Sequence, residues 1–208
     1  MDNLSHAIPV EKVRLSDDGR AVVILDQTMM PGRTETRVLT DAESLREATH
    51  HLRVRGAPAI GICAGYGMYL PAQQSKTECV PEFLAKLQEA KAYLDAARPA
   101  AVNLSWATAR MVRRAEENAR RPVAEIVRLL GGEARRIQAE DIEICRAISE
   151  YGLSLLHDGE GVLTHCNTGP LILGHERGMR FHVFAGETRP LLQGARPTAY
   201  ELSRGVST

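Results

Sequence analysis

A short apolar run that ends in small polar residues and a cysteine constrains this chain more than any other stretch. The stretch covers residues 161–170, where Val162 and Leu163 lead into Thr-His-Cys-Asn before a glycine and a proline interrupt the chain. A buried strand of a parallel sheet ends in this way at a ligand pocket, because apolar residues lie inside the sheet and polar groups gather at its carboxyl end. The stretch therefore predicts a parallel α/β fold with Cys166 at the ligand-binding edge.

The composition of the 208 residues argues against several classes of function. The 26 Lys and Arg balance the 26 Asp and Glu, so no net charge attracts the chain to nucleic acid or to an anionic membrane. No run of 18 apolar residues is present, and residues 1–6 lack the basic region and apolar core of a signal peptide. The four cysteines form no CxxC motif, which favours reduced thiols over a disulfide or zinc framework. We expect a cytoplasmic protein that binds neither nucleic acid nor membrane.

The first 130 residues show a small hairpin followed by mainly helical patterns. Two apolar runs, around Val13 and over 21–25, flank an Asp-Asp-Gly turn and predict two paired strands. Thr40 and Glu43 match a capping box at the start of a helix. Further helices are expected over 81–97, over 108–120 with a basic and exposed surface, from Pro122 to Gly131-Gly132, and over 133–156 with Ile137, Ile144, Ile148 and Leu155 facing inward. Trp106 is expected to fill the core.

A second candidate ligand site lies just before a glycine-rich helix. Arg53 and Arg55 precede Gly56 and Ala57, and Pro58 is favoured in the first turn of a helix. Free N–H groups at a helix N-terminus, the positive end of its dipole and guanidinium groups together suit a phosphate. The helix that follows contains three glycines, Gly61, Gly65 and Gly67. Their small size leaves tight helix packing and close approach of a ligand equally open.

From about residue 133 the pattern changes to alternating helix and strand. A second strand is predicted over 179–185, after the strand that leads to Cys166. The connection from Thr168 to Gly178 has only 11 residues, fewer than the dozen or so of a usual parallel crossover. The fold class is therefore α/β: residues 1–130 form a mainly helical domain with a small β-hairpin, and residues 131–208 form an incomplete Rossmann-like parallel α/β domain.

Four stretches, in this order, resemble the methylthioribose-1-phosphate isomerase family of methionine salvage. They cover residues 53–61, 98–106, 163–169 and 187–202, and Asp26-Gln27-Thr28 also fits the family. The superfamily includes archaeal ribose-1,5-bisphosphate isomerase and regulatory subunits of the exchange factor for eukaryotic initiation factor 2. The resemblance implies a mainly helical domain followed by a Rossmann-like domain, a homodimer, and a reaction that needs no cofactor or metal.

The resemblance also implies roles for individual residues. Cys166 matches the active-site cysteine of the family. The phosphate or sugar of the substrate would be bound by Arg55, Gly56, Ala57, Arg98 and Gln193. The family converts an aldose 1-phosphate, 5-methylthioribose 1-phosphate, into the corresponding ketose 1-phosphate. Proton transfer through an enolate-like species and a hydride shift are both open routes.

One part of the family's active site does not occur in these 208 residues. The family's catalytic aspartate, in a Gly-Ala-Asp-Arg motif, and its Asn-Lys substrate pair would both fall beyond Thr208. We therefore expect this polypeptide to be truncated before the aspartate and to turn over little substrate by itself. Two alternatives stay open: a non-catalytic sugar-phosphate-binding or regulatory protein, and a ribose-1,5-bisphosphate isomerase.

Overall fold

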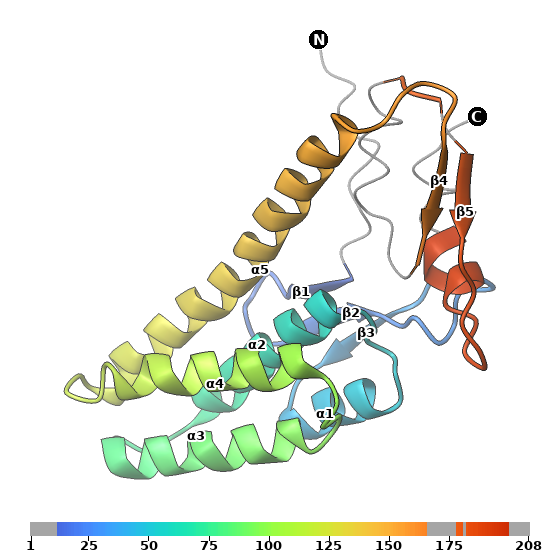
Figure 1. Ribbon diagram of the computed structural model, residues 1–208. Helices are drawn as coiled ribbons and strands as arrows, with labels where there is room; N and C mark the ends of the chain where they lie inside the picture. Colours follow the sequence, from blue (N-terminus) through green and yellow to red (C-terminus); the bar gives the residue numbers. More distant parts are fainter. Residues whose placement is uncertain (1–11, 166–177, 181, 200–208) are drawn as a thin grey trace. The chain divides into compact units, whose positions relative to one another are not determined.

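The chain divides into two compact units in the computed structural model, which describes residues 12–165, 178–180 and 182–199 (Figure 1). The first, the helical unit, consists of Lys12–Thr28 and Glu35–Glu140. The second unit contains Met29–Thr34 and the described residues from Asp141 onward. Helix α5, Val123–Leu153, begins in the helical unit and ends in the second. The division at residue 130 drawn from the sequence stays a prediction.

A three-stranded antiparallel sheet opens the helical unit and confirms the predicted hairpin. Strands β1 (Val13–Leu15), β2 (Val22–Leu25) and β3 (Thr36–Leu39) lie in the order β1-β2-β3. Gly19 has a φ of 70° in the turn between β1 and β2, a left-handed conformation that glycine adopts without strain. The buried side chains of the central strand β2 belong to the core of the unit.

Helix α2 forms the centre of the helical unit. The helices of this unit are α1 (Ala42–His50), α2 (Ala57–Gln74), α3 (Val80–Asp95), α4 (Val102–Glu116) and the first part of α5. Every residue of α2 from Ala59 to Leu70 is buried, as in a helix that is apolar on all sides and surrounded by other elements. It packs against α1, α3 and α4, which Figure 1 shows around it.

The three glycines of α2 let neighbouring helices approach closely. A Cβ atom added to Gly61 would lie 3.2 Å from the carbonyl oxygen of Asn103 on α4. One added to Gly65 would lie 3.1 Å from Cδ1 of Ile137 on α5, and one at Gly67 would come equally near to α3. All three distances are shorter than an ordinary van der Waals contact. Close packing of the helices therefore explains all three glycines.

The cap of α1 differs by one residue from the predicted one. Asp41, not Thr40, is the N-cap, and its carboxylate accepts a hydrogen bond of 2.8 Å from the backbone N–H of Ser44. The Ser44 hydroxyl in turn accepts from the Asp41 N–H at 3.4 Å, and Glu43 takes no part in the box. The prediction from Thr40 and Glu43 was wrong because two adjacent side chains were able to cap, and the backbone path selected the carboxylate.

Gly131-Gly132 does not end a helix, contrary to the prediction. Helix α5 continues through the pair as one element. A Cβ atom at Gly131 would lie 2.9 Å from Cε2 of the Tyr69 ring on α2, so the glycine makes room for that ring. A glycine inside a helix costs about 1 kcal/mol relative to alanine, and packing against α2 outweighs this preference.

Helix α4 is amphipathic and not simply exposed, and Trp106 is not part of the core. The helix begins at Val102 and buries one face, which includes Leu104 and Met111. Trp106 is 47% exposed, with the Arg110 guanidinium 5.4 Å from the centre of its ring. The predicted start at residue 108 was late because the first two turns carry the apolar residues that face α2.

Two parallel strands in the second unit confirm the predicted parallel pairing. Strand β4 (Gly161–Thr164) pairs with β5 (His182–Ala185), with Leu163 opposite Phe184. The side chains of both residues are exposed, at 69% and 61%. Most of the connection between the strands, including the short predicted crossover, lies outside the described residues.

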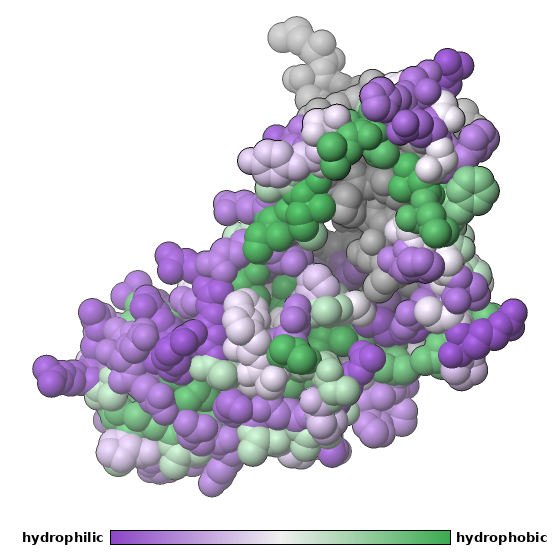
Figure 2. All heavy atoms as spheres, viewed as in Figure 1, coloured by the Kyte–Doolittle hydropathy of each residue, from purple (hydrophilic) through white to green (hydrophobic). Residues whose placement is uncertain are grey.

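The last part of α5 does not bury its apolar face. Ile144, Ile148 and Leu155 are 58%, 56% and 76% exposed, although the sequence predicted that they face inward. Figure 2 shows hydrophobic side chains at the surface along this part of the helix. Of the four predicted inward residues only Ile137, in the helical unit, is buried. Helical periodicity marks an apolar face, but burial requires an element opposite it, and the described residues supply none here.

Candidate functional site

The segment Arg55-Gly56-Ala57 forms the N-terminus of α2, as predicted. Gly56 is the N-cap residue, with φ 92° and ψ 130°, and Pro58 lies in the first turn. No side-chain hydrogen bond caps this end among the described residues, and a Cβ atom at Gly56 would meet nothing within 4 Å. The first-turn N–H groups of a helix have no partner inside the helix. Together with the positive end of the dipole, they make this end of α2 suitable for an anion.

Arg53 and Arg55 have different surroundings. Arg53 forms ion pairs with Asp26 (Nη1 to Oδ2, 3.0 Å) and with Glu47 (Nη2 to Oε1, 2.8 Å). Arg37 reaches the same Oδ2 of Asp26 at 2.5 Å. Arg55, in contrast, is buried with 6% of its surface exposed. Arg53 is therefore bound to two carboxylates, while Arg55, which the resemblance implies as a ligand of the substrate, lies directly before the N-cap residue Gly56.

Asp26 is ionised in this network. Burial by itself would raise the pKa of its carboxyl group, but hydrogen bonds from Thr28, Arg37 and Arg53 outweigh burial and hold the pKa below its usual value. The hydrogen bonds from Arg53 likewise lower the pKa of Glu47. The loop before α2 is thus held by a charged network.

The segment Asp26-Gln27-Thr28, which had no predicted role, contacts the backbone that leads into α2. The backbone N–H of Gln27 donates to the carbonyl of Arg53 at 3.0 Å, and its side-chain Nε2 donates to the carbonyl of Arg55 at 3.1 Å. Both Asp26 and Gln27 are buried. The sequence did contain a signal for this segment, because three polar residues follow directly after an apolar strand. The same pattern occurs in the segment that leads to Cys166.

Arg98 lies at the same end of the helical unit as Arg55. It is half-buried in the loop between α3 and α4. The preceding carbonyl, of Ala97, lies 3.3 Å from Nδ1 of His50 at the end of α1. Asn103, in the first turn of α4, lies against Gly61 near the start of α2. The structure therefore brings the predicted residues Arg55, Gly56, Ala57 and Arg98 to one region where α2 and α4 begin.

Gln193 lies at the carboxyl edge of the strands β4 and β5. A Cβ atom at Gly186, just after β5, would collide with the ring of His165, just after β4. One at Gly194 would lie 2.6 Å from the carbonyl oxygen of Gly186, so the loop that carries Gln193 packs directly on this edge. Cys166, which follows His165 in the chain, lies outside the described residues.

Glu187 fixes the loop that carries Gln193. Its carboxylate accepts hydrogen bonds from the backbone N–H groups of Thr188, Gly194 and Ala195, at 2.8, 2.8 and 3.0 Å. Burial acts to raise the pKa of Glu187, and these N–H groups lower it below the usual value. Glu187 therefore orders a loop, and its role follows from backbone contacts that sequence reasoning does not reveal.

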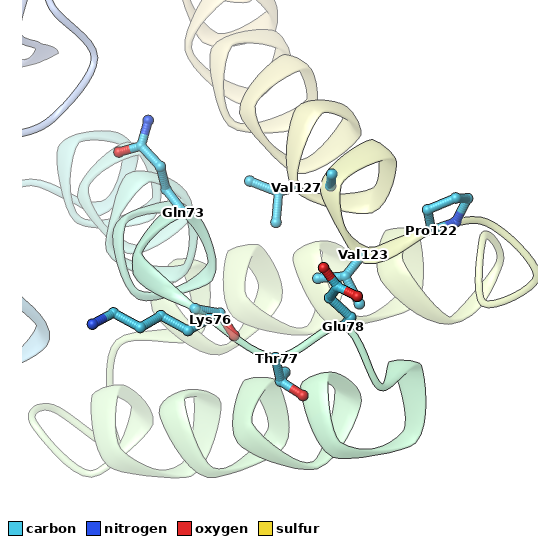
Figure 3. A pocket seen from close by; sticks show the side chains of 9 residues that line it. Gln73, Lys76, Thr77, Glu78, Pro122, Val123 and Val127 are labelled. Carbon is cyan, nitrogen blue, oxygen red and sulfur yellow. The ribbon is translucent and has the colours of Figure 1, made fainter.

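A separate cavity of about 670 Å³ lies at the opposite end of α2. Lys76 and Glu78 from the connection between α2 and α3 line it, with Val123 and Val127 from α5 opposite (Figure 3). None of the residues predicted to bind substrate lies in it. Within the described ranges no three His, Cys, Asp or Glu side chains are close enough to hold a metal ion. No described helix is long and apolar enough to cross a membrane.

The fold and this arrangement agree with one family. The profile of the Initiation factor 2 subunit family matches residues 53–206, and the chain belongs to this family. This confirms the family recognised from the four stretches of sequence.

Several similar proteins are named as sugar-phosphate isomerases. A methylthioribose-1-phosphate isomerase of Symbiobacterium thermophilum is 49% identical over 205 residues, which cover 93% of this chain and 57% of the relative. A 5-deoxyribose 1-phosphate isomerase of Petrotoga mobilis is 45% identical over 205 residues, covering 93% and 59%. The crystal structure of 5-methylthioribose 1-phosphate isomerase from Pyrococcus horikoshii OT3 matches with a TM-score of 0.86 and 35% identity, covering 93% and 57%. The chain thus spans less than three fifths of the length of these relatives.

Proposed function

We propose that the chain functions in an aldose–ketose isomerase that converts 5-methylthioribose 1-phosphate into 5-methylthioribulose 1-phosphate. The observation that carries the proposal is the N-terminus of α2, where Gly56 faces open space beside the buried Arg55. A sugar 1-phosphate carries the dianion that such a helix end binds. The names of the relatives support the reaction type.

The proposed roles follow the resemblance. The first turn of α2 and the guanidinium of Arg55 bind the phosphate, Arg98 and Gln193 hold the sugar phosphate, and Cys166 acts at the reacting carbons. The phosphate ester at C1 prevents simple ring opening, so the site must stabilise an intermediate while hydrogen moves between C1 and C2. The Gly-Ala-Asp-Arg motif of the family does not occur in the 208 residues, so we expect weak turnover.

The relatives differ in the substituent that their substrates carry at C5 of the sugar, so this substituent has to be chosen for the present chain. Relatives are named for 5-methylthioribose 1-phosphate and for 5-deoxyribose 1-phosphate, which differ only in the group on C5. We favour the methylthio sugar, because the relative with the higher identity carries that name. Binding constants for these two sugars and for ribose 1,5-bisphosphate, which carries a charge at C5, distinguish the three substrates.

Binding and turnover of the 208-residue protein test the proposal. Calorimetric titration with 5-methylthioribose 1-phosphate measures binding, and detection of the ketose 1-phosphate measures turnover. We expect Arg55→Ala to weaken binding about tenfold or more, since a charged hydrogen bond to phosphate is lost. Arg53→Ala alters the neighbouring guanidinium that is bound to carboxylates, and a smaller loss is expected there.

Three results of this experiment have different meanings. Product formation supports the isomerase and shows that the missing motif is dispensable. Binding without product agrees with an isomerase that lacks the Gly-Ala-Asp-Arg motif and also with the non-catalytic, regulatory alternative, which the name of the Initiation factor 2 subunit family favours. Absence of binding overturns the proposed site. If product forms, deuterium from D₂O in the product identifies proton transfer, and its absence identifies a hydride shift.

A homodimer in the cytoplasm is part of the same proposal. It rests on the resemblance and on large apolar side chains that the described residues leave exposed on α5. Light scattering after size-exclusion chromatography measures the mass directly, and a monomer at all concentrations contradicts it.

A further inference from the structure

The segment Asp26-Gln27-Thr28 begins where strand β2 ends, so the sheet determines its position. The backbone N–H of Leu25 donates to Lys12 and that of Asp26 donates to Glu35, at 2.9 and 2.8 Å. Asp26 and Gln27 are 0% and 2% exposed. Two polar residues are therefore buried at a point that the backbone fixes on both sides. Buried polar groups in proteins are nearly always hydrogen-bonded, and the partners of these two residues indicate their use.

Gln27 binds the backbone immediately before the N-terminus of α2. Its N–H and its Nε2 donate to the carbonyls of Arg53 and Arg55, on either side of the fully buried Val54. These two hydrogen bonds attach the backbone of residues 53–55 to Gln27. The next residue is Gly56, with its φ of 92°. Gln27 thus fixes the backbone directly before Gly56, the residue with the positive φ.

Asp26 holds the same span through a side chain. Its Oδ2 lies 3.0 Å from Nη1 of Arg53, and Arg53 also binds Glu47 on α1. The other oxygen, Oδ1, accepts from the N–H and the hydroxyl of Thr28, at 3.0 and 2.5 Å. The backbone of residues 53–55 and the side chain of Arg53 are therefore both attached to the residues that follow β2.

We propose that Gln27, supported by Asp26, is a positioning residue that holds Arg55-Gly56-Ala57 in the conformation that binds the phosphate of the substrate. The inference rests on the proposed function of the α2 N-terminus. Gln27 touches neither phosphate nor sugar in this account. It acts through the Arg55 carbonyl, so that the N–H groups of the first turn keep one fixed direction. A helix end binds an anion well only when these N–H groups converge on it.

The chemistry of the contact explains why glutamine is required. The acceptor is a carbonyl, so the side chain must supply an N–H donor. Glutamate has the same length but its carboxylate only accepts, and it would place a negative charge against the carbonyl. Methionine has a similar volume but donates no hydrogen bond. Gln27→Glu and Gln27→Met therefore remove the bond while nearly preserving the space.

Two measurements on the whole 208-residue protein test the inference, with 5-methylthioribose 1-phosphate as the probe. Calorimetry gives its dissociation constant, and amide hydrogen exchange reports the opening of residues 53–60. We expect Gln27→Met to weaken binding by about tenfold, since a buried donor bond is lost. Exchange should speed up by a similar factor at Arg53 and Val54, whose N–H groups donate to the Ala48 carbonyl. A structural role alone would lower the thermal midpoint without changing the dissociation constant.

Gln74→Met is the matched control. Gln74 also donates its Nε2 to a backbone carbonyl, that of Thr40, at 2.9 Å, but it lies at the C-terminal end of the same helix. We expect this variant to bind the probe within about twofold of the unchanged protein.

Acidification provides a rescue that a donor role predicts, because it removes the negative charge and restores an O–H donor. Protonated glutamic acid has an O–H that can donate to the Arg55 carbonyl. The affinity of Gln27→Glu, divided by that of the unchanged protein at each pH, should therefore rise from about pH 8 to about pH 5. A flat ratio counts against donation by residue 27.

The outcomes separate this inference from the proposed function. If the unchanged protein does not bind 5-methylthioribose 1-phosphate, the proposed function fails. If it binds and Gln27→Met binds equally tightly, the positioning role alone is overturned. Weaker binding with faster exchange, both absent in Gln74→Met, supports it.

Discussion

At the scale of single residues, two arginines that lie close together in the sequence differ in their surroundings. Arg53 and Arg55 are separated by one residue, and both precede the same helix. The side chain of Arg53 is bound by Asp26 and Glu47, whereas Arg55 is buried beside the open end of α2. The carboxylates that decide this come from 27 residues upstream and from α1, so nothing in the local sequence separates the two.

Asp26→Asn tests the charged network. Removing the charge leaves Arg53 and Arg37 with a weaker partner in a buried position, so we expect the free energy of unfolding at pH 7 to fall by about 2–4 kcal/mol. The folded-state pKa of Asp26 is lowered. Its contribution is therefore present above the unfolded pKa of about 3.9 and is lost as the pH falls through the folded value.

Urea unfolding of both proteins at several pH values measures this. The difference between Asp26→Asn and the unchanged protein should shrink below about pH 4. A difference that stays constant into the acid range shows that the charge of Asp26 is not the cause.

At the scale of elements, the sequence predicted some boundaries of helices and strands correctly and others wrongly. Strand β4 and the beginning of α2 carry local signals, an apolar run and a proline in the first turn, and both predictions were confirmed. The end predicted at Gly131-Gly132 was wrong, because the ring of Tyr69 takes the space beside that glycine. Such contacts join residues far apart in sequence, so periodicity and propensity do not contain them.

The two adjacent glycines of α5 allow a direct test of this explanation. Gly132→Ala meets nothing within 4 Å and should raise the free energy of unfolding by up to about 1 kcal/mol, through helix propensity. Gly131→Ala places its Cβ 2.9 Å from the Tyr69 ring and should lower it by about 1–3 kcal/mol. Thermal and urea unfolding of the two variants measure both changes. Equal effects would mean that Tyr69 does not restrict position 131.

At the scale of the whole molecule, the two units differ in how well they cover their apolar surface. The helical unit buries α2 and the facing sides of its other helices. The described part of the second unit has two parallel strands, and Leu163 and Phe184 are exposed within it, although parallel sheets usually have both faces covered. The chain also spans less than three fifths of its relatives. Its candidate site residues are divided between the units.

The same substitution at two positions of α5 measures this difference. Ile126 is fully buried in the helical unit, whereas Ile148 is 56% exposed. We expect Ile126→Ala to lower the free energy of unfolding by about 2–5 kcal/mol and Ile148→Ala to change it by less than about 0.5 kcal/mol. Unfolding followed by helical circular dichroism provides the comparison. A large loss for Ile148→Ala would show that this face is covered in solution.

By itself, the sequence determined the class of fold, the family, and the candidate residues at the start of α2, because these depend on local patterns and on short motifs in a fixed order. Only the tertiary structure decided which carboxylates bind Arg53, why Gly131 lies inside a helix, and which backbone carbonyls accept hydrogen bonds from Gln27. Each of these depends on a contact between segments distant in sequence, where burial and hydrogen-bond geometry select one partner among several of the same chemical type.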